Sequence, residues 1–420
     1  MLARPAVLAA YSFAAGLHHS LLDRAMSDVR GAIIPYLPEL TAIRRDLHAH
    51  PEIGFEEVRT SSIVADKLRS WGVDVSLGLG RTGLVGTIRG SRPGSRSIGL
   101  RADMDALPIN EATGLPYASV NPGRMHACGH DGHTAMLLGA ARYLASHRDF
   151  SGTVNLIFQP AEEGLGGAKG MIADGLFERF PCDSVYGMHN LPGMPVGKFG
   201  LREGALLASA GLFEVTFSGK GGHAGLSEHA KYDIAAVLAK YVLALRELAA
   251  NEAEPGETAV IRVGELEGHG GASLNVMPAK TYVGGTMRCF SPQTRAVFTR
   301  RIGELAHILV AEAADASAKV ELRWITTALI NATAQTGVAA RAAAAVAGAH
   351  VDTNTPRLSG GEDFAYMMEV RPGSFIFLGN GTEADGHGQD VHTPKYDFND
   401  DIIPYGVEYW VKLVDHELSD

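Results

Sequence analysis

A short segment of the chain crowds one thiol and several imidazoles beside glycines. It reads His126-Ala-Cys128-Gly-His130-Asp131-Gly-His133. Glycine lets the backbone turn tightly, and thiolate and imidazole groups are ligands that suit zinc or a neighbouring first-row ion. The competing interpretation, for this segment taken alone, is a helix N-terminus with incidental histidines. Metal ligation explains the crowding more economically, and other polar clusters support it.

Two adjacent carboxylates follow an apolar run in the segment Gln159-Pro-Ala-Glu162-Glu163-Gly. Adjacent carboxylates repel each other unless a cation or a proton lies between them. One ligand and one base is a natural division of roles. A metal lowers the pKa of bound water toward neutrality, and a free carboxylate beside it can take the proton and pass it to a leaving nitrogen. A solvated acidic turn is the alternative for an isolated pair.

Two isolated histidines extend the set of candidate ligands. A lone histidine is usually a structural residue, but His189 follows a strand-like run and His392 lies in a turn-like context. The candidate ligands are then Cys128, His130, Glu163, His189 and His392. Five ligands are too many for one catalytic zinc, which must keep an open position. Two ions that share a bridging ligand fit better, and counting the bound metal distinguishes this arrangement from a single-metal enzyme.

Compact apolar runs lead into these polar clusters. Runs 97–102, 153–158 and 184–188 are rich in β-branched residues and predict buried strands of an α/β sheet. They are followed directly by Asp103 and Asp105, by Glu162 and Glu163, and by His189 with Asn190. Ligands gather at the carboxyl ends of strands in such sheets, so we expect these clusters to meet. Amphipathic periodicity predicts helices over 34–48 and 60–71.

The pattern changes between residues 210 and 322. This stretch contains an alternating strand at 212–217, a helical pattern at 233–250, and strand-like residues around Ala259 and Tyr282. Polar clusters resume at 359–364 and 391–394. A chain of 420 residues is too long for one compact core. We therefore predict an α/β catalytic domain with a mixed central sheet flanked by helices, formed by 1–209 and 323–420, and a smaller inserted α+β domain over 210–322.

Composition and charge narrow the class of protein. Hydrophobic residues make up 46% of the chain and charged residues 20%, as in an ordinary globular protein. The formal charge is -10 and no run of Lys or Arg occurs, so nucleic-acid partners are not expected. No apolar run is long enough to span a bilayer, so no membrane partner is expected either.

The cysteine content and the N-terminus bear on the compartment. Three cysteines cannot make a disulfide framework and suit a reducing compartment. An apolar stretch at 6–17 follows Arg4 and loosely resembles a signal-peptide core. Because that stretch contains polar residues, an N-terminal extension over residues 1–25 fits at least as well. We expect a cytoplasmic protein.

The ordered set of motifs resembles the M20 metallopeptidase family, specifically its aminoacylase and hippurate hydrolase branch. The resemblance covers nearly the whole chain from about Leu40. The matching pieces are 44–52, Arg101-Ala-Asp103-Met-Asp105-Ala-Leu-Pro108, the Cys128 segment, 159–164, Gly187-Met-His189-Asn190, 219–223, Gly361-Glu-Asp-Phe364 and His392. Such an ordered series is highly specific.

The resemblance implies a dinuclear metal centre in which Cys128 bridges two ions. It also implies that His130 and Glu163 complete one metal site and that His189 and His392 complete the other. The implied ions are Mn²⁺ or Zn²⁺, with Co²⁺ as a third candidate.

Further residues take roles from the same resemblance. Glu162 would be the general base, and Asp103 would orient a ligand and tune its basicity. The smaller domain would serve as a lid and homodimerisation surface, and His223 would stabilise the developing oxyanion, often in the partner subunit's site. Asn275 and Arg288 resemble substrate-holding residues.

The lid motif departs from the family pattern. Relatives commonly continue Gly-Gly-His-Ala-Ala-Met-Pro-His, whereas this chain reads Gly-Gly-His223-Ala-Gly225-Leu226-Ser227-Glu228-His229. The metal motifs are intact, but the substrate wall is altered.

The function expected from these observations is hydrolysis of the amide bond of a small, hippurate-like or otherwise N-acylated amino acid by metal-activated water. One alternative keeps the metal chemistry but releases an amine or ammonia from a different substrate, such as an aromatic amino acid or a carboxamide. Another is a non-catalytic metal-binding paralogue. Retention of Glu162 disfavours that paralogue, because a structural metal site has no need of a base.

Overall fold

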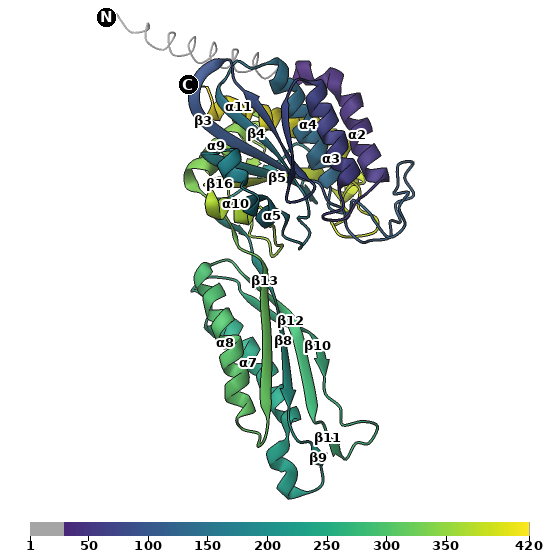
Figure 1. The fold of residues 1–420 in the computed structure, drawn as a ribbon, viewed down its shortest axis with the longest axis vertical. Helices are drawn as coiled ribbons and strands as arrows, with labels where there is room; N and C mark the ends of the chain where they lie inside the picture. The colour runs from purple at the N-terminus through teal and green to yellow at the C-terminus, as the bar shows by residue number, and fades with distance from the viewer. Residues whose placement is uncertain (1–28, 420) are drawn as a thin grey trace, which may run out of the picture.

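Two separate β-sheets organise residues 29–419, which are the residues that the computed structural model describes (Figure 1). The expected N-terminal extension at 1–25 lies outside the described residues. The first sheet has eight strands and the second has four. Among the helices of residues 29–419, none combines the length and the apolar character that crossing a membrane requires.

The eight-stranded sheet is mixed, with strand order β1-β2-β4-β3-β5-β16-β6-β15. Its strands are β1 (Asp74–Leu79), β2 (Gly83–Arg89), β3 (Arg92–Asp103), β4 (Ser151–Gln159), β5 (Ser184–Pro192), β6 (Phe199–Gly200), β15 (Val351–Asp352) and β16 (Gly373–Gly381). β3 pairs in parallel with both β4 and β5, and β5 pairs in parallel with β16. The carboxyl ends of these four strands therefore lie along one edge of the sheet.

Helices cover both faces of this sheet. One face carries α2 (Leu37–Ala49), α3 (Val58–Ser70), α4 (His130–Ser146), α9 (Thr333–Ala347) and α11 (Ile403–Glu417); the other carries α5 (Gly167–Ala173), α6 (Leu176–Arg179) and α10 (Ala365–Val370). Neighbouring residues of β4 enter different cores, Leu156 on the first face and Ile157 on the second, because side chains alternate along a strand. This confirms the expected α/β class with a mixed sheet between helices.

The second sheet is antiparallel and lies beyond one end of the first (Figure 1). Its strands, in the order β10-β12-β8-β13, are β8 (Ser209–Ser218), β10 (Val260–Glu267), β12 (Lys280–Cys289) and β13 (Ser317–Thr326). Helices α7 (Ile234–Asn251) and α8 (Pro292–Val310) pack on it and bury a separate core. The sheet runs four residues past the expected boundary at 322, and the lid role of this region remains a prediction.

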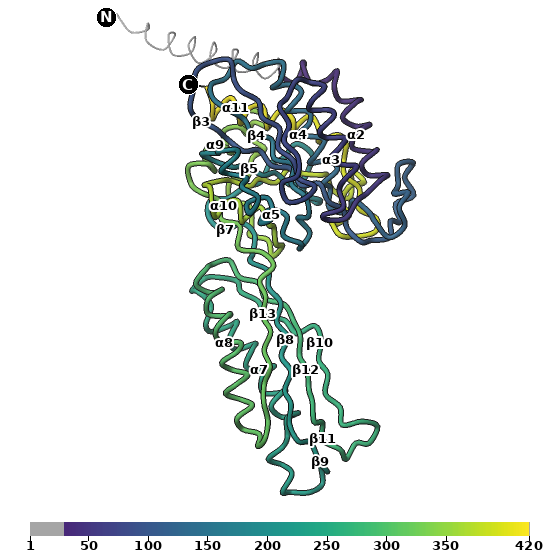
Figure 2. Tube along the Cα trace, viewed as in Figure 1, coloured from purple at the N-terminus to yellow at the C-terminus, as the bar shows by residue number. Residues whose placement is uncertain are grey.

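Short elements complete the chain. The two-stranded ribbons are β7 (Gly204–Leu207) with β14 (Leu329–Asn331), and β9 (Gly222–His223) with β11 (Val276–Met277). The 3-10 helices are η1 (Ile34–Tyr36), η2 (Ser227–Tyr232), η3 (Glu383–Asp385) and η4 (Asp400–Ile402). The trace in Figure 2 leaves the first sheet for β8 and returns from β13, so strands from both sides of the inserted stretch build the eight-stranded sheet.

Candidate metal centre

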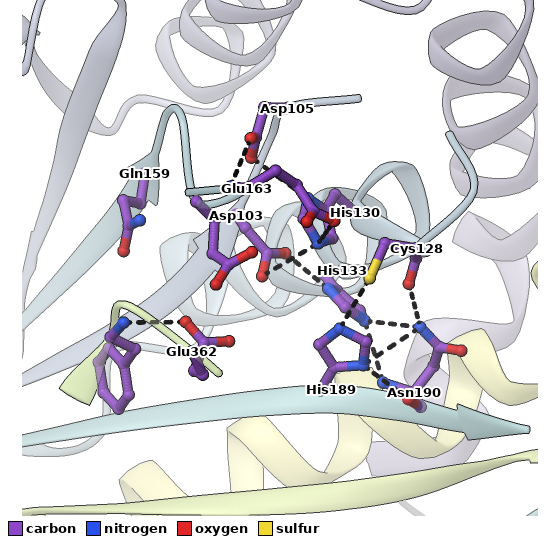
Figure 3. A network of polar contacts seen from close by, with 12 residues as sticks. Asp103, Asp105, Cys128, His130, His133, Gln159, Glu163, His189, Asn190 and Glu362 are labelled. Atoms are coloured by element: carbon purple, nitrogen blue, oxygen red, sulfur yellow. Dashed lines mark hydrogen bonds and ion pairs between the residues drawn. The ribbon is translucent and has the colours of Figure 1, made fainter. Parts of the chain in front are cut away.

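Four segments that are distant in the chain bring the expected ligands together; Figure 3 shows Cys128, His130, Glu163 and His189 among them. Cys128 lies in the loop before α4, and His130 is the first residue of that helix. Glu163 lies in the turn after β4, His189 lies on β5, and His392 lies in the loop between β16 and α11. These elements position all five candidate ligands in one place.

The ligand atoms form two groups of three that share Cys128. One group adds His130 and His189, and the other adds Glu163 and His392; within each group the ligand atoms lie within 4.8 Å of one another. Cys128 Sγ is 3.3 Å from His189 Nε2, and Glu163 Oε1 is 3.1 Å from His392 Nε2. The arrangement suits a thiolate that bridges two ions.

The pairing that the family resemblance implied, His130 with Glu163 and His189 with His392, stays a prediction. The described residues bring a ligand atom of His130 within 4.8 Å of those of both His189 and Glu163, and one of Glu163 within 4.8 Å of those of both His130 and His392. His189 faces the thiol from β5, while His392 contacts Glu163 from its own loop, so Cys128 lies between the two histidines. His130 Nε2 is 4.0 Å from Glu163 Oε1.

Hydrogen bonds determine which nitrogen of each histidine can bind a metal. His189 Nδ1 donates to the backbone oxygen of Asn190 at 2.6 Å, which leaves Nε2 facing Cys128. His130 Nδ1 lies 3.3 Å from Asp105 Oδ1, and His130 Nε2 is buried without a hydrogen-bond partner among the described residues. A metal ion would satisfy such a nitrogen, and the carboxylate on the far side of the ring is the usual second partner of a metal-binding histidine. The free imidazole nitrogens beside the Cys128 thiol therefore suit a divalent metal ion.

Carboxylates around the buried ligands favour a positive charge between them. Burial alone would lower the pKa of His130, but Asp103 and Asp105 raise it to about 10. Burial, reinforced by Glu163, raises the pKa of the Cys128 thiol well above its usual range. A bound cation would favour the deprotonated form of both groups. It would stabilise the thiolate of Cys128 and would take the place of the proton on His130.

Glu162 is buried beside the two groups that share the thiol. Its Oε1 accepts a hydrogen bond from the backbone N of Asp363 at 3.2 Å. Burial, followed by the nearby Glu362 carboxylate, raises the pKa of Glu162 well above its usual range. One of its oxygens lies within 4.8 Å of ligand atoms of His130 and Glu163. A carboxylate of raised pKa next to metal ligands is suited to proton transfer.

The two aspartates that follow the β3 run take different partners. Asp103 Oδ1 lies 2.6 Å from His133 Nδ1, and Asp103 Oδ2 is 3.6 Å from His130 Nε2. Asp105 Oδ1 contacts His130 Nδ1, and Asp105 Oδ2 accepts a hydrogen bond from the backbone N of Glu163 at 3.0 Å. Both aspartates therefore lie against His130, Asp103 near Nε2 and Asp105, which was not among the predicted site residues, at Nδ1. The Asp-x-Asp spacing after a strand was the signal of Asp105 in the sequence.

A buried arginine joins several carboxylates behind Glu162. Arg101 contacts Glu362 Oε1 at 2.9 Å, Asp103 Oδ2 at 2.7 Å and Asp363 Oδ1 at 3.6 Å, and it donates to Gln159 Oε1 at 2.9 Å. Apart from Asp103, these residues were not among the predicted site residues, although they lie in motifs that carry the family resemblance. The guanidinium compensates negative charge that would otherwise be buried unpaired.

Two non-glycine residues of the site have backbone conformations that L-residues seldom adopt. Ala161, just before the glutamate pair, has φ 52°, and His392 has φ 61°. The backbone N of His392 donates to Ala127 O at 2.7 Å, which holds the loop against the Cys128 segment. Such strain persists where surrounding contacts determine it, and it clusters at functional sites.

The remaining predicted residues lie in the inserted stretch, Arg288 on β12 of the second sheet and the other two in or beside the β9–β11 ribbon. His223 and Asn275 are neighbours on the β9–β11 side, with Asn275 Nδ2 3.5 Å from His223 Nε2, and both are exposed. Figure 1 places β9 and β11 at the end of the second sheet farthest from β5. Arg288 donates from Nε to Ser359 O at 3.1 Å, near the junction of the two sheets. Within one chain, His223 and Asn275 are therefore neighbours, but they lie far from the candidate metal ligands.

Comparisons with known proteins identify relatives of this chain. The sequence profile of peptidase family M20/M25/M40 matches residues 99–416. Hippurate hydrolase of Campylobacter jejuni is 38% identical over 376 residues, which cover 89% of this chain and 95% of that protein. N-acetyl-L-cysteine deacetylase of Bacillus subtilis is 39% identical, over 87% of this chain and 85% of that protein.

A solved structure extends the likeness to the fold. The crystal structure of a dinuclear metal-binding peptidase of family M20 from Bacillus subtilis matches with a TM-score of 0.79 and 31% identity. The match covers 92% of this chain and 99% of that one.

Proposed function

Since this chain belongs to peptidase family M20/M25/M40, we propose that its two-metal centre hydrolyses the amide bond of a small N-acyl amino acid. The protein is a metal-dependent amidohydrolase. The observation that carries the proposal is the pair of three-residue donor groups that share Cys128, next to the buried Glu162.

The same five residues would hold both ions. Cys128 would be shared by both ions, and His130, Glu163, His189 and His392 would complete the two sets of ligands. When bound, divalent ions polarise an amide carbonyl and lower the pKa of water. Mn²⁺ and Zn²⁺ are the proposed metals, with Co²⁺ as a third candidate, because thiolate, imidazole and carboxylate ligands accommodate all of them.

Glu162 is the proposed general base. Its carboxylate takes a proton from the attacking water and then delivers that proton to the nitrogen of the leaving amino acid. The hydrogen bond from the backbone N of Asp363 to Oε1 restrains the carboxylate during both transfers.

His223 is the proposed oxyanion donor, and it would act in the site of a partner subunit. Its ring is exposed beside Asn275, at an end of the second sheet that lies away from the ligands of its own chain. A donor aimed at the developing oxyanion stabilises the tetrahedral intermediate. This role requires a homodimer formed through the second sheet, and Asn275 and Arg288 would contact the substrate.

The proposed compartment of the protein is the cytoplasm.

The acyl group is the open part of the substrate. One relative is named for hippurate and another for N-acetyl-L-cysteine, so relatives of this chain differ in the acyl group that they remove. The altered wall at Gly225-Leu226-Ser227 lies next to His223 and would contribute to that choice.

A substrate screen tests the proposal. The purified protein is stripped of metal, reloaded separately with Zn²⁺, Mn²⁺ and Co²⁺, and incubated with acetyl, benzoyl and indoleacetyl conjugates of several amino acids. Mass spectrometry then measures free amino acid, other amines and ammonia. Metal-dependent release of the amino acid is expected. Release of ammonia or an unrelated amine alone, from an expanded set of carboxamides, would contradict the proposed substrate class.

A further inference from the structure

Asn190 is a buried amide that joins three segments of the candidate metal centre. It follows His189 on β5, and Figure 3 shows it between that ring and the Cys128 loop. Its side-chain Nδ2 donates to the backbone oxygen of Cys128 at 2.7 Å, and its Oδ1 accepts a hydrogen bond from the Tyr396 hydroxyl at 2.9 Å. One side chain therefore links β5, the loop before α4, and the loop that carries His392.

The Cys128 loop is packed closely against this amide. Gly129, the next residue, has φ 94°. A Cβ at that position would lie 2.3 Å from Asn190 Nδ2 and 2.4 Å from the Tyr396 hydroxyl. Only glycine adopts this conformation without strain and leaves this space. The loop that presents the thiol is therefore seated directly on Asn190 and Tyr396.

The backbone of Asn190 is held on both sides. Its oxygen accepts the hydrogen bond from His189 Nδ1 at 2.6 Å, and its N donates to His133 Nε2 at 3.0 Å. Because His133 Nε2 accepts, the ring carries its proton on Nδ1, which lies 2.6 Å from Asp103 Oδ1. His133 thus connects Asp103 to the backbone of Asn190 through hydrogen bonds on its two nitrogens.

The third link runs toward His392. Tyr396 is buried, and its backbone N donates to Thr393 O at 3.2 Å, within the turn that follows His392. The Tyr396 hydroxyl ends on Asn190. The side-chain amide of Asn190 therefore connects this turn to β5.

We propose that Asn190 is a positioning residue, which sets the Cys128 loop, His189 and the His392 turn at the mutual separations that two metal ions need. It binds no metal itself. Only a side-chain amide of this length offers one donor to Cys128 O and one acceptor to the Tyr396 hydroxyl at once. The inference rests on the proposed metal centre, and it does not depend on which amide is hydrolysed.

Asn155 provides a matched control for a truncation of Asn190. It is also a buried asparagine of a central strand, and its Nδ2 donates to Pro181 O at 3.0 Å while its Oδ1 accepts from the Thr87 hydroxyl at 3.0 Å. It lies four positions before Gln159, the last residue of β4, away from the ligands. Asn155→Ala and Asn190→Ala thus remove the same pattern of hydrogen bonds.

Metal affinity and thermal stability are measured for both variants of the full chain. Competition with a chromophoric chelator gives the affinity for Zn²⁺ and Mn²⁺, elemental analysis gives the metal content, and thermal unfolding is followed on the metal-free proteins. Both variants should unfold at lower temperature than the wild type. Only Asn190→Ala should lose metal affinity, by about 10- to 100-fold, as is typical when an outer residue of a metal site is removed. Equal metal affinities in the two variants would overturn the proposal.

Tyr396→Phe keeps the proposal testable if Asn190→Ala does not fold. It removes one hydroxyl and leaves the ring in the core. We expect weaker metal binding with an unchanged circular dichroism spectrum, and wild-type affinity in this folded variant would refute the positioning role. If the wild type binds two ions and hydrolyses no N-acyl amino acid, the proposed substrate class fails while the positioning role still stands or falls on these affinities.

Discussion

Arg44 Nε donates to Asp400 Oδ1 at 2.7 Å and so ties helix α2 to the loop that follows His392. The guanidinium is fully buried, and it also lies 3.6 Å from Asp131 and 3.5 Å from Asp397. Arg45, the next residue, reaches the other oxygen of Asp400 at 2.8 Å, but about half of its side chain is exposed. Two neighbouring arginines thus share one carboxylate in different environments.

Arg44→Met should destabilise the fold far more than Arg45→Met. Removing the buried guanidinium leaves uncompensated carboxylates and should cost about 3–5 kcal/mol. Removing the exposed one should cost no more than about 1 kcal/mol. Urea denaturation of both variants measures the free energy of unfolding. Similar losses would mean that Arg44 does not balance the buried carboxylates.

Asp105→Ala should weaken metal binding without unfolding the protein. Asp105 contacts His130 Nδ1 and accepts a hydrogen bond from the backbone N of Glu163, so its loss frees two candidate ligands at once. We expect about a 10- to 100-fold loss of affinity in a chelator competition. Asp174→Ala is the control, because that carboxylate accepts from the backbone N of Gly80 at 2.7 Å in another part of the domain. Equal affinities in the two variants would argue against a role of Asp105 in orienting ligands.

Glu162→Gln should abolish turnover and keep the metal. The amide cannot accept the proton, and loss of a general base typically lowers the rate by about 10²- to 10⁴-fold. Glu163→Gln, which changes the adjacent carboxylate, should instead reduce the metal content. Steady-state rates and elemental analysis of the same preparations separate the two effects. A fully metal-loaded Glu162→Gln enzyme with the wild-type rate would remove Glu162 from the chemistry.

Removal of the metal should lower the melting temperature. Buried carboxylates around His130 lose a cation when the site is stripped, and binding to the folded state alone contributes about 2.7 kcal/mol at a free metal concentration of 100 Kd. A thermal scan with and without chelator, followed by readdition of Zn²⁺ or Mn²⁺, measures the shift. Glu162→Gln should show the full shift, whereas Cys128→Ala should show little. A chelator shift in Cys128→Ala as large as in the wild type would place the metal elsewhere.

Sequence patterns predicted three strands of the first sheet and the gathering of polar residues at their ends, because each feature is local. Apolar runs of β-branched residues became β3, β4 and β5, and the polar residues after them met where parallel strands end together. His189 departs slightly from this picture, since β5 continues through it to Pro192.

Relations between distant segments could not be predicted in the same way. Spacing gives no distance between His392 and Glu163, so their contact at 3.1 Å could not be predicted. Asp103 and Asp105 follow the same run, and only the packing of α4 decides which nitrogen of His130 each carboxylate faces. The amide of Asn190 was visible beside a ligand, but its partners lie 62 and 206 positions away.

The passage between the two sheets has a mechanical consequence. The chain crosses it at the start of β8 and the end of β13, and these crossings are paired neighbours, with the backbone N of Ala210 donating to Thr326 Oγ1 at 3.1 Å. Because these two strands are paired side by side, they would turn together, and the second sheet would move as one rigid body about this junction. A small rotation at Ala210 and Thr326 would grow with distance from this junction and would be largest near β9, which carries His223. The position of His223 would therefore depend on the junction at the opposite end of the second sheet, where Arg288 donates a hydrogen bond to Ser359 O.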